Sequence, residues 1–119
     1  MEAGGQAKPD RRRHFRWEVP GTKARIAPRY EAALLNISEG GALIEHSHPV
    51  RPETVLLLTF SVPDQQITLR CRVVRSSEYR YEVRLTGERE HTYRTAMEFL
   101  GIPEDSRVLL DKYIDSLRG

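Results

Sequence analysis

The sequence predicts a mainly β protein, a small antiparallel six- to seven-stranded β-barrel followed by a C-terminal α-helix. The length of 119 residues suits a single domain. Most of the chain alternates apolar and polar residues with a period of two, which is typical of strands with one buried face. Only the last segment changes to a helical period. So many short strands in so short a chain need closure or a cover over their edges, which favours a barrel.

Turn residues divide the alternating part of the chain into seven predicted strands. Pro20 and Gly21 interrupt the first of them, and the run Ser38-Glu39-Gly40-Gly41 ends the second. The predicted strands are 17–27, 30–37, 42–45, 54–60, 67–75, 79–85 and 93–99.

Alternation also predicts which side chains of the later strands face the core, because successive residues of a strand point to opposite faces. The pattern is cleanest in 67–75, where Thr68, Arg70 and Arg72 separate four apolar residues. The residues predicted to point inward in 67–75 are Ile67, Leu69, Cys71 and Val73. Those predicted to share one face in the other three strands are Leu56, Leu58, Phe60, Tyr79, Tyr81, Val83, Leu85, Tyr93, Thr95, Met97 and Phe99.

The end of the chain predicts a helix over about 104–117. Its apolar residues recur at i, i+3, i+4 and i+7, which places them on one helical face. Pro103 suits the first turn, and Glu104 and Asp105 suit the positive end of the helix dipole. The residues of the apolar face are Leu110, Tyr113, Ile114 and Leu117.

The distribution of charge points to an anion site near the start of the chain. The net charge is only +2, but residues 1–29 hold eight Lys and Arg against three Asp and Glu, and the rest holds eleven against fourteen. Residues 1–10 are small and polar and are predicted to be a disordered tail. The predicted domain therefore spans 11–117 and begins with a cluster of arginines.

The single cysteine and the apolar runs predict the compartment. Cys71 cannot form an intramolecular disulfide and alternates with core residues, so we expect it in the core of a cytoplasmic protein without an apolar leader. The longest apolar run, 55–58, is far short of the ~20 residues that span a bilayer.

His46 and His48 flank Ser47 like a pair of metal ligands, but no third ligand stands out, and we expect both to be surface loop histidines.

Two segments carry the chemistry. The first contains Arg11, Arg12, Arg13 and Arg16, whose guanidinium forks can pair with phosphate or with the guanine edge. By itself this segment favours a solvated basic tail or a nonspecific nucleic-acid arm, because charge runs are usually solvated. The neighbouring Phe15 and Trp17 are expected to pack on the barrel, with base stacking as the alternative.

The second segment is the run from Asn36 to Gly41 between two apolar strands. Asn36 offers an amide and Ser38 a hydroxyl, and the paired glycines permit a close approach by a ligand. By itself the run favours a tight connection between strands with turn-forming side chains.

Taken in order, the two segments resemble the signature of the PilZ domain, a bacterial receptor for the second messenger cyclic di-GMP. RRxxxR is formed by Arg11, Arg12 and Arg16, and NxSxxG by Asn36, Ser38 and Gly41. NISEGGALIE resembles the strand–turn–strand of the family, and TAMEFLGIPEDSRVLLDKYI resembles its closing strand and helix. The resemblance covers 11–117, as in a stand-alone member. Asn36 replaces the commoner Asp, and 79–91 looks like an additional strand and turn.

The resemblance implies a binding module for cyclic di-GMP and no enzyme. Arg12 and Arg16 would contact phosphates and guanine edges, while Asn36 and Ser38 would bond one guanine. Gly41 would let the ligand lie close to the backbone. Arg11, directly before RxxxR, is associated in the family with a stacked ligand dimer, which implies two ligands per chain. The arginine loop would become ordered on binding and signal to a downstream effector protein.

Two other functions remain compatible with the sequence. One is a PilZ-like adaptor that binds only protein, although such members usually lack the arginine motif. The other is a small β-barrel nucleic-acid binder, which the acidic balance outside the arm disfavours. No nucleophile with a neighbouring general base is readable in the sequence.

Overall fold

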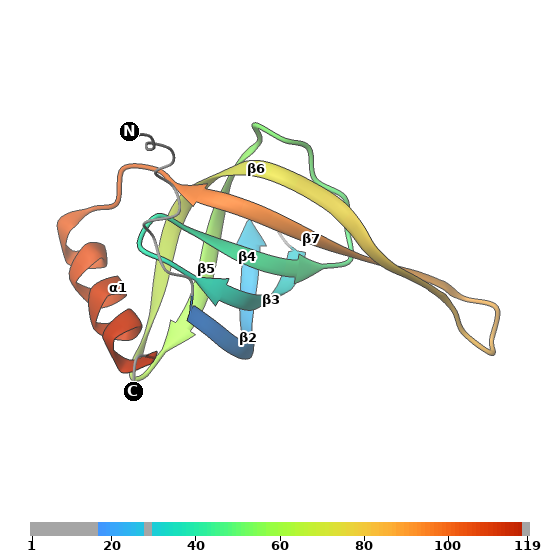
Figure 1. Ribbon diagram of the computed structural model, residues 1–119, viewed down its shortest axis with the longest axis horizontal. Helices are drawn as coiled ribbons and strands as arrows, with labels where there is room; N and C mark the ends of the chain where they lie inside the picture. The colour runs from blue at the N-terminus through green and yellow to red at the C-terminus, as the bar shows by residue number, and fades with distance from the viewer. Residues whose placement is uncertain (1–16, 28–29, 118–119) are drawn as a thin grey trace, which may run out of the picture.

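A computed structural model of the chain describes residues 17–27 and 30–117. These residues form six strands and one helix (Figure 1). The elements are β2 (Trp17–Ala27), β3 (Tyr30–Ile37), β4 (Gly41–His46), β5 (Val55–Val62), β6 (Gln65–Val83), β7 (Arg89–Phe99) and α1 (Glu104–Leu117).

The strands close into an antiparallel barrel in the order β2-β3-β4-β7-β6-β5. β2 pairs with β5 and thereby joins the two ends of the sheet. A register shift between Glu18 and Thr22 falls at the Pro20-Gly21 signal, so the first strand is irregular there but continuous. The predicted barrel with a C-terminal helix is confirmed.

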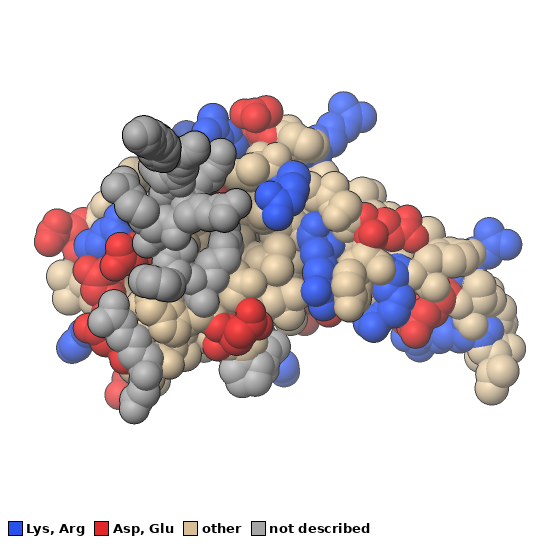
Figure 2. Space-filling model, in the orientation of Figure 1, with Lys and Arg blue, Asp and Glu red and all other residues tan. Residues whose placement is uncertain are grey.

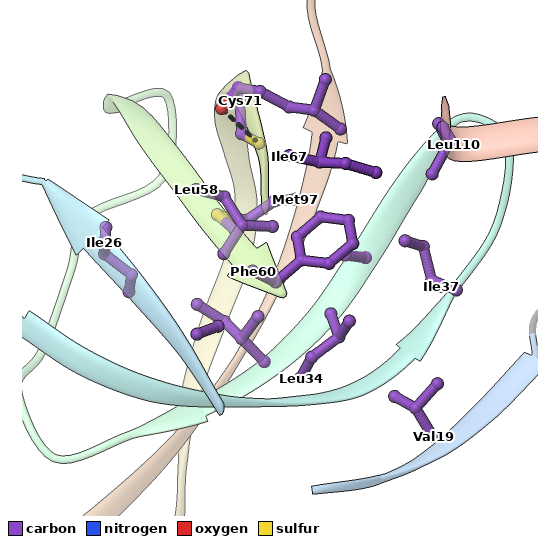
Figure 3. Packing of buried hydrophobic residues seen from close by; sticks show 14 of the residues in the cluster. Val19, Ile26, Leu34, Ile37, Leu58, Phe60, Ile67, Cys71, Met97 and Leu110 are labelled. Atoms are coloured by element: carbon purple, nitrogen blue, oxygen red, sulfur yellow. Dashed lines mark hydrogen bonds between the residues drawn. The ribbon is translucent and has the colours of Figure 1, made fainter. Parts of the chain in front are cut away.

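The core fills the inside of the barrel (Figure 3). All four inward residues predicted for 67–75 are at most 1% exposed, and Leu58 and Phe60 of β5 are equally buried. Cys71 is among them, as predicted. Period-two alternation therefore identified the buried face of β5 and of the barrel half of β6 correctly.

Helix α1 packs on the barrel with the face that its spacing predicts. Leu110, Tyr113 and Ile114 are buried and belong to the core cluster. The ring centroids of Tyr113 and Phe60 are 5.9 Å apart. Figure 1 shows α1 beside the end of the barrel where β3 passes into β4.

One strand prediction was wrong. The segments 67–75 and 79–85 belong to a single strand, β6, with register shifts between Val73 and Arg75 and between Glu78 and Arg80. Between the two segments stand Ser76, Ser77 and Glu78, with no glycine or proline, so the strand can continue through them with its backbone extended. Its far half and the start of β7 form an arm that leaves the barrel (Figure 1). The predicted inward residues of this half are therefore exposed: Tyr79, Tyr81, Val83 and Leu85.

Candidate functional site

The turn from β3 to β4 is organised by Ser38. Its hydroxyl accepts hydrogen bonds from the amides of Gly40, at 3.3 Å, and Gly41, at 3.2 Å. The same hydroxyl donates to the Gly41 carbonyl at 3.3 Å, and the Ser38 amide donates to that carbonyl at 2.9 Å. Ser38 is only 2% exposed. Its side chain therefore shapes the turn through backbone groups, which stabilises a serine or threonine turn.

Asn36 precedes this turn at an irregularity of β3. The register of β3 with β4 shifts between Leu34 and Asn36, and Asn36 then pairs with Leu43 on one side and Glu18 on the other. A bulge turns consecutive side chains away from strict alternation. As a result Asn36 and Ile37 are both buried, and Asn36 is 8% exposed. The amide thus lies at the rim of the barrel wall.

Gly41 lies against the neighbouring strand. A Cβ atom at this position would overlap the carbonyl oxygen of Met97 in β7. The backbone of Gly41 does not have a positive φ. Among the described glycines, Gly87 and Gly101 do. Glycine at this position is therefore needed for the packing of β4 against β7, and the close approach of a ligand stays a prediction.

The turn is tied to both β7 and α1. The Phe99 amide donates to the Gly40 carbonyl at 2.9 Å, and the Arg107 guanidinium donates to the Glu39 carbonyl at 3.3 Å. A hollow of about 220 Å³ lies between the turn and the helix. It is lined by Glu39, Asp111, Ile114 and Asp115. Sequence reasoning missed this acidic lining, because no local signal relates a turn residue to a helix about 70 positions later.

The register of β2 brings the start of the described chain to this turn. Trp17 pairs with Ile37, and Glu18 pairs with Asn36. Trp17 is partly buried and packs against the core, which agrees with the packing role expected for it. Arg11, Arg12 and Arg16 lie outside the described residues, as do Arg13 and Phe15.

The histidine prediction was half wrong. His46 is the last residue of β4, is 5% exposed, and has Nε2 2.6 Å from Thr95 Oγ1. It continues the alternation of Ala42 and Ile44, which is the signal that could have placed it inside. His48 is exposed and stacks on Tyr30, with ring centroids 4.4 Å apart. Across residues 17–27 and 30–117, no three His, Cys, Asp or Glu side chains group as metal ligands would.

Cys71 offers no reactive thiol. It is fully buried, and burial raises its pKa to about 12. The thiolate, which is the nucleophilic form, is therefore scarce at neutral pH.

Comparison with known proteins identifies the fold and the family. The model of the PilZ domain family matches residues 10–116. No sequence among the curated proteins is a significant match. In the part of the chain that the structure describes, no helix is long and apolar enough to cross a membrane.

Several solved structures are similar to this chain. The PilZ domain of YcgR from Escherichia coli with c-di-GMP has a TM-score of 0.70 at 20% identity, and 92% of each chain is covered. The Bacillus subtilis inhibitor of motility MotI/DgrA has a TM-score of 0.65 at 19% identity, over 91% of this chain and 51% of that one. The K. pneumonia MrkH–c-di-GMP complex has a TM-score of 0.61 at 18% identity, over 92% of this chain and 56% of that one. This chain thus spans about half the length of the last two.

Proposed function

Because this chain belongs to the PilZ domain family, whose members are non-catalytic receptors, we propose that it is a receptor for cyclic di-GMP. The ligand would be held by Arg11, Arg12 and Arg16 together with the turn residues Asn36, Ser38 and Gly41. Two of the similar structures above, those of YcgR and MrkH, contain c-di-GMP, which supports this ligand.

The observation that carries the proposal is the register of β2 on β3. Trp17 lies opposite Ile37, and Arg16 is covalently bonded to Trp17. RRxxxR ends at Arg16, directly before the residue that pairs with Ile37, so in the proposed complex it would lie near NxSxxG at one end of the barrel. A ligand at this end could contact both motifs at once. This would be impossible if β2 paired with β3 in a register that kept the two motifs apart.

Electrostatics assign the arginines the larger share of the binding. Cyclic di-GMP is a dianion, and the nearby carboxylates of Glu39, Asp111 and Asp115 disfavour an anion at the turn. Arginine forks can compensate, because they pair with phosphate and with the O6/N7 edge of guanine in two-pronged contacts. Asn36 at the rim of the wall would then supply the neutral recognition of one guanine.

The output of such a receptor is a new surface. We propose that the dianion draws residues 11–16 onto the face near Asn36–Gly41 and that ligand and ordered segment are then read by an effector protein. The barrel needs no rearrangement for this, because its strands are already closed by their own hydrogen bonds.

Isothermal titration calorimetry with cyclic di-GMP tests the receptor function. We expect saturable binding that Arg12→Ala and Arg16→Ala each weaken by about 10- to 150-fold, the cost of one charge-assisted hydrogen bond. Arg25→Ala is the matched control, because Arg25 is exposed on β2 opposite Thr59 and Glu31, at the other end of that strand from Trp17.

GTP and single-stranded DNA serve as competing ligands in the same titration. Equal affinity for DNA would favour the nucleic-acid binder instead. Absence of cyclic di-GMP binding in the unaltered protein would leave the protein-only adaptor.

The stoichiometry of the titration tests the role of Arg11. We expect two cyclic di-GMP molecules per chain, because an arginine at this position would give a second, stacked ligand a further charge contact. Arg11→Leu should then reduce the number to one without abolishing binding. One ligand per unaltered chain would reject the role of Arg11 while leaving the receptor assignment intact.

A further inference from the structure

Residues 74–92 form an arm that contributes no residue to the proposed binding site. It is formed by the far half of β6 and the first part of β7, and Figure 1 shows it projecting from the barrel. Strand β5 pairs with β6 only as far as Arg72, and β4 pairs with β7 only from Tyr93. Within the described chain, both outer edges of the arm are therefore unpaired. A long exposed strand edge is a template for pairing with another strand.

Side chains of the arm contact one another and the barrel. The Arg94 guanidinium lies 3.6 Å from the centroid of the Tyr79 ring and donates to Glu45 at 3.0 Å, which anchors the arm to β4. Further out, the Tyr81 and His91 rings lie 4.7 Å apart. These contacts keep the outer edge of β6 extended, so little order remains to be gained when it pairs.

The exposed edge carries a self-complementary pattern of charge. From Glu78 to Arg84 every second residue is charged, in the order Glu, Arg, Glu, Arg. An antiparallel copy reads in the opposite direction and therefore presents Arg wherever the first strand presents Glu. A two-fold axis at Tyr81 would place Arg80 of each copy opposite Glu82 of the other. The irregularity between Glu78 and Arg80 leaves Glu78 outside this regular stretch. Opposite charges in directly facing positions stabilise a sheet.

The two inner charges of this pattern lack salt-bridge partners. Glu82 pairs in register with Glu90, so two carboxylates face each other across the arm, an unfavourable arrangement. Among the described residues neither Glu82 nor Arg80 forms a salt bridge, and Arg80 only lies 5.7 Å from the Tyr79 ring centroid. The outer two are satisfied within the arm, since Arg84 lies 2.7 Å from Glu90 and Glu78 lies 3.4 Å from His91.

We propose that the chain forms a two-fold symmetric dimer in which the β6 edges of two arms pair antiparallel around Tyr81, with Arg80 of each copy opposite Glu82 of the other. The two hairpins then form one four-stranded sheet, and Tyr81 lies on the axis against its own copy. Such an interface is isologous, so it closes at two chains. Figure 2 shows the mixed positive and negative side chains along the arm, which favour a second copy over a partner of one charge sign.

This dimer is independent of the proposed ligand. The arm continues past the end of β4 marked by His46, which pairs with Tyr93, whereas the turn at Ser38 lies at the other end, where Gly41 pairs with Glu98. Both turns of a dimer therefore remain accessible, and the test needs no ligand.

Sedimentation velocity of the ligand-free chain over a concentration series tests the proposal. We expect a reversible dimer. Arg80→Glu places two carboxylates opposite each other twice, and Glu82→Arg does the same with two guanidinium groups, so each should weaken the dimer by at least about tenfold. Mixing these two variants should restore dimers of one chain of each kind, because every facing pair is then opposite in charge.

Two controls separate pairing from a general effect of charge. The double variant Arg80→Glu/Glu82→Arg should dimerise like the unaltered chain. Arg75→Glu makes the same charge change on the same strand, but its facing position in the proposed register is Gly87, so its dimerisation should be unchanged. A monomer at all concentrations overturns the proposal, and so does a dimer that neither single variant weakens. Failure of the mixed variants and of the double variant to dimerise would likewise overturn this register.

Discussion

Gly41 shows how a motif residue can be required by the barrel itself. A side chain at position 41 would overlap the Met97 carbonyl, so the contact between β4 and β7 needs glycine there whether or not a ligand binds. Ser38 is similar, because its buried hydroxyl is engaged by the backbone of the turn. Losing such a hydroxyl leaves buried backbone groups unsatisfied, at a cost of about 1–3 kcal/mol. Variants of these two residues therefore alter the turn as well as any ligand contact, and the arginine variants are the cleaner test of binding.

His46 makes the stability of the barrel depend on pH. Its Nε2 lies 2.6 Å from Thr95 Oγ1, which in turn lies 2.8 Å from Ser76 Oγ. Burial lowers the pKa of His46 from the ordinary value of 6.5. The folded state therefore resists protonation that the unfolded state accepts.

The expected effect follows from the direction of this shift. The contribution of neutral His46 to the free energy of unfolding is fully present above pH 6.5, the pKa of the unfolded state. It decreases as the pH falls from there towards the lower pKa of the folded state. The slope is at most about 1.4 kcal/mol per pH unit. Urea unfolding at about pH 7.5 and about pH 5.5 measures this difference in the free energy of unfolding. His46→Gln should flatten this part of the profile. An unchanged profile in His46→Gln would contradict the prediction.

At the scale of elements, α1 contributes to the core through one face only. Leu110 is fully buried, while Val108 on the same helix is 49% exposed. Leu110→Ala should lower the free energy of unfolding by about 2–5 kcal/mol, because it removes buried apolar surface and leaves a cavity. Val108→Ala should change it by no more than about 0.5 kcal/mol. Chemical denaturation of both variants checks this, and equal effects would mean that α1 does not pack as described.

Strand β6 shows what periodicity can and cannot predict. The alternation of Ile67, Leu69 and Cys71 identified a buried face because the barrel closes over it. Alternation resumes at Tyr81 and Val83, yet in the described chain both side chains are exposed, Val83 to 58%. Period two reports that a segment is extended, whereas burial depends on which other elements reach it. That information is not local, so the arm could not be separated from the wall by pattern alone.

At the scale of the whole molecule, closure positions the candidate site. The sequence identified Asn36, Ser38 and Gly41 by motif, and it identified the β-barrel by alternation and length. It could not predict that Trp17 would pair with Ile37, because strand register depends on contacts across the whole sheet. Nor could it predict the acidic hollow beside Glu39, which exists only because α1 packs next to the turn. Local patterns thus supply the candidate residues, and the closed sheet decides which of them meet.

The same closure predicts how binding would be transmitted. The barrel wall is already complete, so ligand binding should alter the arginine segment and leave the strands unchanged. Arg11, Arg12, Arg13 and Arg16 repel one another, and a dianion supplies a shared partner. Ordering them costs about 1–2 kcal/mol per residue in backbone entropy, which the phosphate and guanine contacts must exceed.

Amide hydrogen exchange with and without cyclic di-GMP measures this ordering directly. We expect the amides of 11–16 to exchange more slowly when the ligand is bound, together with those of the turn from Ser38 to Gly41. The amides of 67–74 are the internal control, because this part of β6 lies in the barrel wall and β7 separates it from β4. If 11–16 are equally protected in both states, the site is preformed and ligand binding must be communicated by another element. If 67–74 change instead, the barrel itself responds, and a rigid wall is the wrong description of the receptor.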